Sequence, residues 1–317
     1  MKRHFTYQSQ DGVTRIHAIE WIPDVPVQAV LQICHGMVEY IDRYDDFARY
    51  LARHGYYVTG HDHLGHGQSV QDDSCHGYFH ETKGNEYVIG DIHRLRKRTL
   101  KKYPNVPYFI LGHSMGSFLV RQYIELYGKG LSGAIIMGTG AQPAPLLIAG
   151  KSLCRIIAAQ KGWDYRSKFI DNMVFASYNK RFEPARTDKD WLTKDEKIVD
   201  AYLAHPWCTF RFTVNAYYHM FRGIQFLQKK KNICKIPKNL PLFLVAGSDD
   251  PVGNFGKNVK KVYRIYQACQ IQDVQLKLYE TDRHEILNET DRLDVYRDLL
   301  DWMNEKGYSE QIVFGSL

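Results

Sequence analysis

The stretch Leu111-Gly112-His113-Ser114-Met115-Gly116-Ser117 decides the predicted fold of this chain. It contains the pattern Gly-x-Ser-x-Gly between the apolar run PYFILGH (107–113) and a segment with helical spacing from 116 to 127. After a strand and before a helix, the two glycines permit a sharp, strained turn that lifts the serine hydroxyl above the edge of a sheet. We therefore predict that Ser114 is a nucleophile, the alternative being an idle serine in a glycine-rich turn.

Strand and helix patterns alternate on both sides of this turn. Two aromatic and β-branched segments separated by Asp11-Gly12 predict an N-terminal antiparallel hairpin. Further apolar strands alternate with amphipathic helices, which is typical of an α/β fold with a mostly parallel central sheet and helices on both faces. The predicted strands are 4–8, 14–22, 29–36, 56–62, 107–113, 133–140, 240–247 and 274–280, and the predicted helices are 45–55, 86–103, 116–127, 257–269 and 291–306.

The alternation stops between Ala141 and about Pro237, where the pattern is mostly helical. We expect this segment to form a helical cap insertion (141–237) between an N-terminal core part (1–140) and a C-terminal core part (238–317). In the run 143–162, apolar residues lie broadly on one side, which predicts a stripe that packs on the core, gates an acyl chain or touches lipid. The stripe consists of Leu146, Leu147, Leu153, Cys154, Ile156 and Ile157.

A serine hydroxyl is a weak nucleophile that needs a base held by an acid. In this kind of sheet both partners follow later strands, in the order Ser, Asp, His. The strand at 240–247 leads into Asp249-Asp250-Pro251, and the strand at 274–280 leads into the loop that carries His284. Because Pro251 restricts the preceding residue to extended backbone, we predict Asp250 rather than Asp249 as the acid. The predicted catalytic residues are Ser114, Asp250 and His284.

Two backbone N–H groups are predicted to hold the oxyanion that forms during attack. One belongs to Met115, directly after the serine, and the other to Met37, in the loop that follows the strand at 29–36. Glu39 and Arg43 are close enough in the sequence to brace this loop, although a plain surface ion pair is an equal alternative.

These motifs resemble the monoacylglycerol lipase and lysophospholipase branch of the α/β-hydrolases, in the serine aminopeptidase S33-type fold family. The matching runs are HGMVEYIDRY (35–44), DHLGHGQS (62–69), GHSMG (112–116), GSDD (247–250) and RHE (283–285), in the expected order over nearly the whole length. The resemblance implies a cofactor-free serine hydrolase of lipid metabolism. Its substrate is a carboxylic ester with a single acyl chain, such as a monoacylglycerol or lysophospholipid, cleaved through an acyl-enzyme intermediate.

Three histidines within six residues, His61, His63 and His66, raise the possibility of a zinc site of the H-x-H-x-D-H kind. Gly65 stands where that pattern needs its Asp, and the resemblance implies that this loop is structural. We therefore expect no metal and no cofactor.

Other functions stay open at this point. A proline-type aminopeptidase uses the same three catalytic residue types but needs cap carboxylates for a substrate ammonium, which Glu183, Asp188 and Asp190 are candidates to supply. A general small-ester carboxylesterase is a further alternative. The complete set of Ser, Asp and His argues against a catalytically silent binding protein.

Composition excludes several partners. The net charge of +7 includes the basic runs RLRKR (94–98) and KKKN (229–232), but neither carries the interleaved aromatics that stack on nucleic-acid bases. The six cysteines form no C-x-x-C pair, which favours reduced thiols. With neither a secretory signal nor a bilayer-spanning run, we expect a cytoplasmic protein. We expect a small lipid or ester substrate, no nucleic acid, no stable partner, and transient contact of the cap with lipid surfaces.

Overall fold

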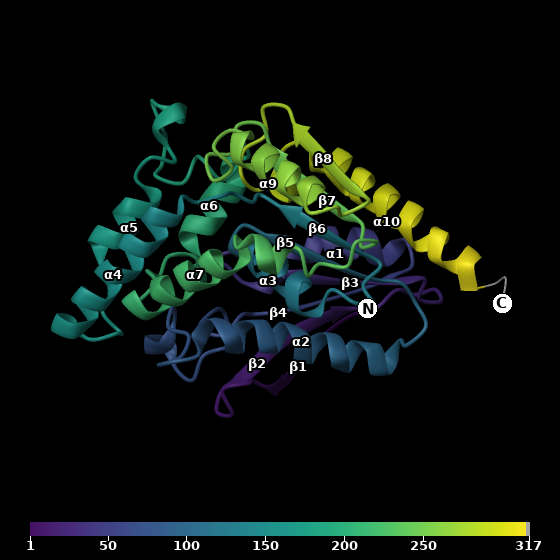
Figure 1. The fold of residues 1–317 in the computed structure, drawn as a ribbon, viewed down its shortest axis with the longest axis horizontal. Coiled ribbons are helices and arrows are strands. Elements are labelled where there is room, and N and C mark those ends of the chain that lie inside the picture. Colours follow the sequence, from purple (N-terminus) through teal and green to yellow (C-terminus); the bar gives the residue numbers. More distant parts are fainter. Residues whose placement is uncertain (315–317) are drawn as a thin grey trace.

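The computed structural model describes the backbone of residues 1–314 and the side chains of residues 1–307. Its strands form one sheet in the order β1-β2-β4-β3-β5-β6-β7-β8 (Figure 1). The pairs β1–β2 and β2–β4 are antiparallel, and all the other neighbouring strands pair in parallel. The strands are β1 (Lys2–Gln8), β2 (Arg15–Trp21), β3 (Ala29–Cys34), β4 (Tyr56–His61), β5 (Tyr108–His113), β6 (Gly133–Met137), β7 (Leu242–Gly247) and β8 (Val274–Tyr279). The predicted N-terminal hairpin and mostly parallel sheet are confirmed.

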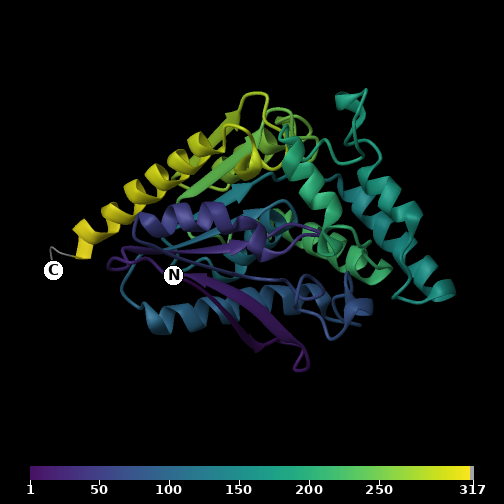
Figure 2. The same ribbon diagram turned by 180° about the vertical axis from the view of Figure 1, so that it is seen from behind.

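Two sets of helices cover the two faces of the sheet. The helices α2 (Gly84–Lys102), α3 (Met115–Tyr127) and α9 (Lys257–Ala268) pack on one face, and α1 (Asp45–Arg53) and α10 (Arg292–Phe314) pack on the other. Figures 1 and 2 show these sets on opposite sides of the sheet. Every residue of β3, β5 and β7 is buried, because parallel strands covered on both faces have no solvent side.

The chain between β6 and β7 forms helices that lie at the end of the sheet where its parallel strands terminate (Figure 1). They are α4 (Ala144–Lys161), α5 (Lys168–Phe175), α6 (Glu196–Ala204) and α7 (Val214–Leu227). The short helix α8 (Lys230–Ile233) follows α7 on the way back to the start of β7. These helices agree with the mostly helical pattern of the segment, although that pattern did not single out α7, whose aromatic residues hid its helical spacing. Thr213 caps α7, because its side chain accepts a hydrogen bond from the N–H of Ala216.

The predicted apolar stripe of α4 is correct for four of its six residues: Leu147 and Cys154 are buried, and Leu153 and Ile157 are partly buried against the core. The buried face of the helix consists of Leu147, Gly150, Cys154 and Ala158, which follow the i, i+3, i+4 spacing of one helical side. Leu146 and Ile156 point away from this side and are 49% and 58% exposed. Small residues replace the expected large ones because α7 lies close, and a Cβ on Gly150 would stand 2.9 Å from the ring of Phe221.

The last helix, α10, extends beyond the predicted end at residue 306 to Phe314. In the described part of the chain, no helix combines the length and the apolar composition that crossing a membrane requires.

Candidate active site

Ser114 stands at the sharp turn between β5 and α3. Its backbone has φ 53° and ψ −119°, a strained conformation that is rare for a residue with a side chain. The turn is possible because the flanking glycines let other backbone groups approach. A Cβ on Gly116 would lie 2.0 Å from the carbonyl oxygen of Cys34, and a Cβ on Gly112 would lie 2.2 Å from that of Gly116. The strand, turn and helix predicted around Ser114 are therefore present.

His284 and Asp250 form a buried pair on the loops that follow β8 and β7. Nδ1 of His284 lies 2.9 Å from Oδ1 of Asp250, and their side chains are 2% and 0% exposed. The N–H of Val252 donates to the same oxygen at 2.9 Å, which fixes the carboxylate. Asp249 lies outside this pair, with its carboxylate 3.3 Å from Arg181 and 28% of its side chain exposed.

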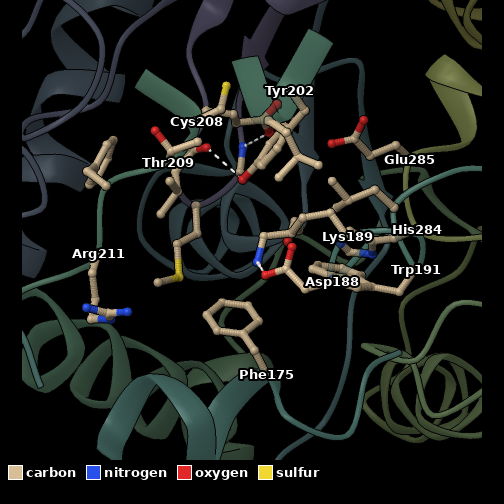
Figure 3. Close-up of a pocket in the computed structure, with 18 of the residues that line it drawn as sticks. Phe175, Asp188, Lys189, Trp191, Tyr202, Cys208, Thr209, Arg211, His284 and Glu285 are labelled. Atoms are coloured by element: carbon tan, nitrogen blue, oxygen red, sulfur yellow. Dashed lines mark hydrogen bonds and ion pairs between the residues drawn. The ribbon is translucent and has the colours of Figure 1, made fainter. Parts of the chain in front are cut away.

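The second ring nitrogen of His284, Nε2, takes no part in this pair. Within the described residues, Nε2 of His284 has no hydrogen-bond partner, and His284 and Ser114 line the same cavity. The ring of Trp191 lies beside the imidazole, with centroids 5.1 Å apart (Figure 3). A Cβ on Gly138 would approach Cε1 of His284 to 3.1 Å. Packing therefore holds the ring in one orientation.

Sequence reasoning missed Trp191 and Gly138. The contact of Trp191 with His284 arises only from the tertiary fold, so no spacing signal reveals it. Gly138, by contrast, follows β6 at φ 59°, and its place after a strand was a usable signal.

The two residues whose N–H groups are the predicted oxyanion donors lie at the cavity that contains Ser114. Met37 and Met115 line this cavity together with Ser114. Among the described residues, the backbone N–H groups of Met37 and Met115 donate no hydrogen bond. The loop of Met37 comes close to the serine, since a Cβ on Gly36 would lie 3.0 Å from that of Ser114. The arrangement leaves two donors available beside the serine.

A buried network of charged groups braces this loop. Glu39 accepts from the N–H of Gly36 and from Arg43 at 2.8 Å, and Arg43 also binds Glu285 at 2.8 and 2.7 Å. The side chains of Arg43 and Glu39 are 10% and 4% exposed, so the alternative of a surface ion pair is wrong. Because Glu285 follows His284, the network joins the loop of Met37 to the loop of His284.

His113 is part of the same network. Its Nδ1 lies 3.3 Å from Oε1 of Glu39, and its Nε2 lies 3.2 Å from the carbonyl oxygen of His284. Burial opposes a charge on this ring, but the hydrogen bond and the charge of Glu39 outweigh it and raise the pKa of His113. Burial alone would raise the pKa of Glu39, yet His113 and Arg43 lower it. The network is thus held together by charge as well as by hydrogen bonds.

Two cavities of different character reach Ser114. One has a volume of about 350 Å³ and is lined mostly by apolar side chains, including Phe118, Leu147, Met220, Phe221 and Ile224. The other has a volume of about 250 Å³ and is lined partly by polar side chains, including Asp171, Asp188, Lys189, Thr209 and Arg211 (Figure 3).

The charges of the polar cavity occur in pairs. Nζ of Lys189 lies 3.1 Å from Asp188, and Nε of Arg211 lies 3.3 Å from Asp171. Each cation therefore has a carboxylate partner before any ligand binds.

The three histidines of the loop after β4 contact one another and the backbone. The N–H of His63 donates to Nε2 of His35 at 2.9 Å, and the ring of His63 lies 3.2 Å from His61. Burial lowers the pKa of His35 to about 3 and that of His66 to about 4, so these rings are neutral. These contacts give the cluster a structural role, and the expectation that no metal binds stays a prediction.

The carboxylates considered for an aminopeptidase are dispersed. Asp188 lines the polar cavity but is paired with Lys189. Asp190 accepts hydrogen bonds from Arg186 and Thr187, which orders its own loop. Within the described chain, neither Glu183 nor Asp190 lines a cavity that reaches Ser114. The three groups do not form an ammonium site.

Comparisons with known proteins show the family to which the chain belongs. The family model described as "Serine aminopeptidase, S33" matches residues 25–291. Monoglyceride lipase of Rattus norvegicus is 26% identical over 293 residues, covering 90% of this chain and 86% of that protein. Monoacylglycerol lipase of Mycolicibacterium smegmatis is 24% identical over 296 residues, covering 92% of this chain and 94% of that protein.

Solved structures share the same architecture. A thermostable carboxyl esterase from Bacillus coagulans superposes with a TM-score of 0.89 at 27% identity, covering 96% of this chain and 98% of that one. A soluble variant of monoglyceride lipase from Saccharomyces cerevisiae superposes with a TM-score of 0.76 at 19% identity, covering 96% and 95%. The second likeness shows the fold alone.

Proposed function

The chain belongs to the serine aminopeptidase S33 family of α/β-hydrolases and is an ester hydrolase of the lipase kind, and we propose that it cleaves the ester of a lipid with a single acyl chain. The observation that carries the proposal is the meeting of an apolar and a polar cavity at Ser114. An ester with one long chain and a small polar alcohol has this same division of character on the two sides of its carbonyl.

In the proposed mechanism Ser114 attacks the carbonyl carbon while Nε2 of His284 takes the hydroxyl proton. Asp250 keeps a proton on Nδ1 and stabilises the imidazolium. The N–H groups of Met37 and Met115 donate to the oxyanion. His284 then returns the proton to the departing alcohol, which leaves an acyl group on Ser114. A water molecule, deprotonated by His284, attacks this acyl-enzyme and releases the carboxylic acid.

The alcohol side of the substrate is proposed to be uncharged. Lys189 and Arg211 already have carboxylate partners, so a phosphate would have to compete with Asp188 and Asp171 for these cations. A cationic group meets the opposite difficulty, because Asp188 and Asp171 are neutralised by the same pairs. Hydroxyl groups make hydrogen bonds to such groups without displacing a charge. This balance favours a monoacylglycerol over a lysophospholipid.

We propose that residues 141–237 form a cap over Ser114, between core parts 1–140 and 238–317. The helices α4 and α5 expose large apolar side chains, namely Leu146, Ile148, Ile156, Phe169 and Met173, of which Leu146 and Met173 also line the apolar cavity. Exposed apolar side chains gathered on one part of a surface are typical of a site that contacts other molecules. Transient contact of this cap surface with lipid aggregates is therefore part of the proposal.

A fluorophosphonate probe tests the nucleophile. The probe should label the wild-type protein and fail to label Ser114→Ala, whose hydrolysis of p-nitrophenyl esters should also disappear. Equal labelling of both folded proteins would exclude Ser114 as the nucleophile.

A substrate panel tests the rest of the proposal. It contains p-nitrophenyl esters of increasing chain length, a monoacylglycerol, lysophosphatidylcholine and Pro-naphthylamide. We expect the highest kcat/KM for the monoacylglycerol. Turnover of the naphthylamide alone would establish an aminopeptidase, and turnover of short esters alone would establish a small-ester carboxylesterase.

A further inference from the structure

Two cysteines that are remote in the sequence have adjacent sulfur atoms. Cys234 follows α8 and Cys269 follows α9, and their Sγ atoms lie 3.1 Å apart. Both are free thiols in the structure. A disulfide has a sulfur separation of about 2.05 Å, so the two sulfurs need to approach by only about 1 Å.

A lysine holds the two backbones in this arrangement. Nζ of Lys238 donates to the carbonyl oxygens of both Cys234 and Cys269, each at 2.9 Å. The carbonyl of Lys238 in turn accepts from the N–H of Gln272 at 2.8 Å. Because these hydrogen bonds fix the separation of the two segments, they hold the two thiols next to each other in the folded protein.

The two thiols differ in access to solvent. Cys234 is exposed, whereas Cys269 is only 4% exposed. Burial, together with the neighbouring Cys234, raises the pKa of Cys269 to about 11, which keeps it protonated at neutral pH. Cys234 is therefore the thiol that meets an oxidant first, with Cys269 placed to react with its product.

We propose that Cys234 and Cys269 form a reversible intramolecular disulfide when the protein meets a peroxide. The thiolate of Cys234 attacks one oxygen of hydrogen peroxide, the O–O bond breaks, and the second oxygen leaves as water after taking a proton. The sulfenic acid that forms is attacked by the sulfur of Cys269, which creates the S–S bond and releases a second water. Two thiols are thus oxidised by two electrons, and one peroxide is reduced to two waters.

The position of the pair indicates a stabilising role rather than a catalytic one. Cys234 precedes the start of β7 and Cys269 precedes the start of β8, whereas Asp250 and His284 follow the ends of these parallel strands. The bond would therefore form at the edge of the sheet opposite to the candidate active site. It would close a loop of 35 residues and restrict the unfolded chain.

Oxidation of the purified full-length protein tests the proposal. After treatment with hydrogen peroxide, intact mass should fall by two hydrogen atoms, and non-reducing peptide mapping should recover a peptide that links Cys234 to Cys269. For a loop of this size in a chain of 317 residues, Tm should rise on the order of 5 °C, and dithiothreitol should reverse the rise. The kcat/KM of oxidised and reduced enzyme on a p-nitrophenyl ester should agree within about twofold.

Variants give the matched controls. Cys234→Ser, at an exposed position, should abolish both the linked peptide and the rise in Tm, and Cys75→Ser should preserve both. A sulfinic acid on Cys234 with Cys269 still a free thiol would overturn the proposed bond. A bond that forms without a rise in Tm would overturn the stabilising role.

Discussion

Asp249 and Asp250 are adjacent carboxylates with different surroundings, so a matched pair of Asn variants tests the proposed mechanism. Asp250 is fully buried and its Oδ1 contacts Nδ1 of His284 at 2.9 Å. Asp249 lies 3.3 Å from Arg181, and both side chains of that pair reach solvent. Each replacement removes one negative charge and keeps the shape of the side chain, but only one of them acts on the imidazole.

The expected effects differ by orders of magnitude. In Asp250→Asn the imidazolium formed during attack loses its counter-charge, and an amide N–H turned toward Nδ1 stabilises the wrong tautomer. The same change in a serine protease lowers kcat by about 10⁴, which corresponds to about 5.5 kcal/mol. In Asp249→Asn the lost interaction is a partly exposed ion pair, which contributes less than about 1 kcal/mol, so kcat should change by less than about fivefold.

Steady-state hydrolysis of a p-nitrophenyl ester measures kcat and KM for both variants and the wild type. Thermal unfolding of each protein serves as the control, since a loss of activity is informative only where the fold is retained. Comparable losses in the two variants, or a larger loss in Asp249→Asn, would refute the assignment of Asp250 as the partner of His284.

Two further predictions concern the cluster of His61, His63 and His66 and the buried acid Glu125. Prolonged treatment with EDTA should leave esterase activity unchanged, and activity lost to the chelator and restored by zinc would contradict a metal-free mechanism. His63→Ala should lower the free energy of unfolding by about 2–4 kcal/mol with little effect on kcat of the folded enzyme. Burial raises the pKa of Glu125 to about 9, although Arg121 and Lys235 oppose the shift. Between its ordinary pKa and 9 the unfolded chain has lost a proton that the native state retains, so stability falls as pH rises, on the order of 1 kcal/mol per pH unit. Glu125→Gln should therefore lose less stability than wild type between about pH 5 and 8 in urea unfolding, the exposed Glu280→Gln should behave as wild type, and equal pH profiles for all three proteins would refute a protonated Glu125.

Local chemistry explains which parts of the site the sequence could predict. The turn at Ser114 follows from the two glycines and the flanking strand and helix, all within a few residues. The contact of Asp250 with His284 was predicted from Pro251 and from the order of the strands, and the structure contains it. In these cases the information lies near the residue itself, and their catalytic roles stay predictions.

Features that depend on distant packing could not be predicted in this way. Helical spacing did not decide which side of α4 is buried, because the close approach of α7 selects small residues such as Gly150. The Cys234 and Cys269 pair was hidden for the same reason, since spacing rules detect only neighbouring cysteines. Glu39 and Arg43 were recognised as a pair, but their spacing revealed neither that the pair is buried nor that Glu285 is its third partner.

The contacts of the loop 190–194 limit how the proposed cap can open. The N–H groups of His284 and Glu285 donate to the carbonyls of Trp191 and Leu192. The loop 190–194 is therefore held to the loop of His284 by backbone hydrogen bonds. A movement of the whole cap would therefore displace the proposed base.

The packing of the helices between β6 and β7 indicates which of them can move. α7 packs on α3 and α4 packs on α7, whereas α5 buries only Ile170 and exposes Phe169 and Met173. Elements with few buried apolar contacts open at the lowest free energy. Met173 and Phe175 of α5 line the apolar cavity, so we expect displacement of α5 to widen it. This movement must separate the ring of Phe175 from that of Trp191, on which it stacks with centroids 6.2 Å apart. We therefore expect the proposed acyl chain to enter at α5, because an opening there can keep the hydrogen bonds from His284 and Glu285 to the loop 190–194.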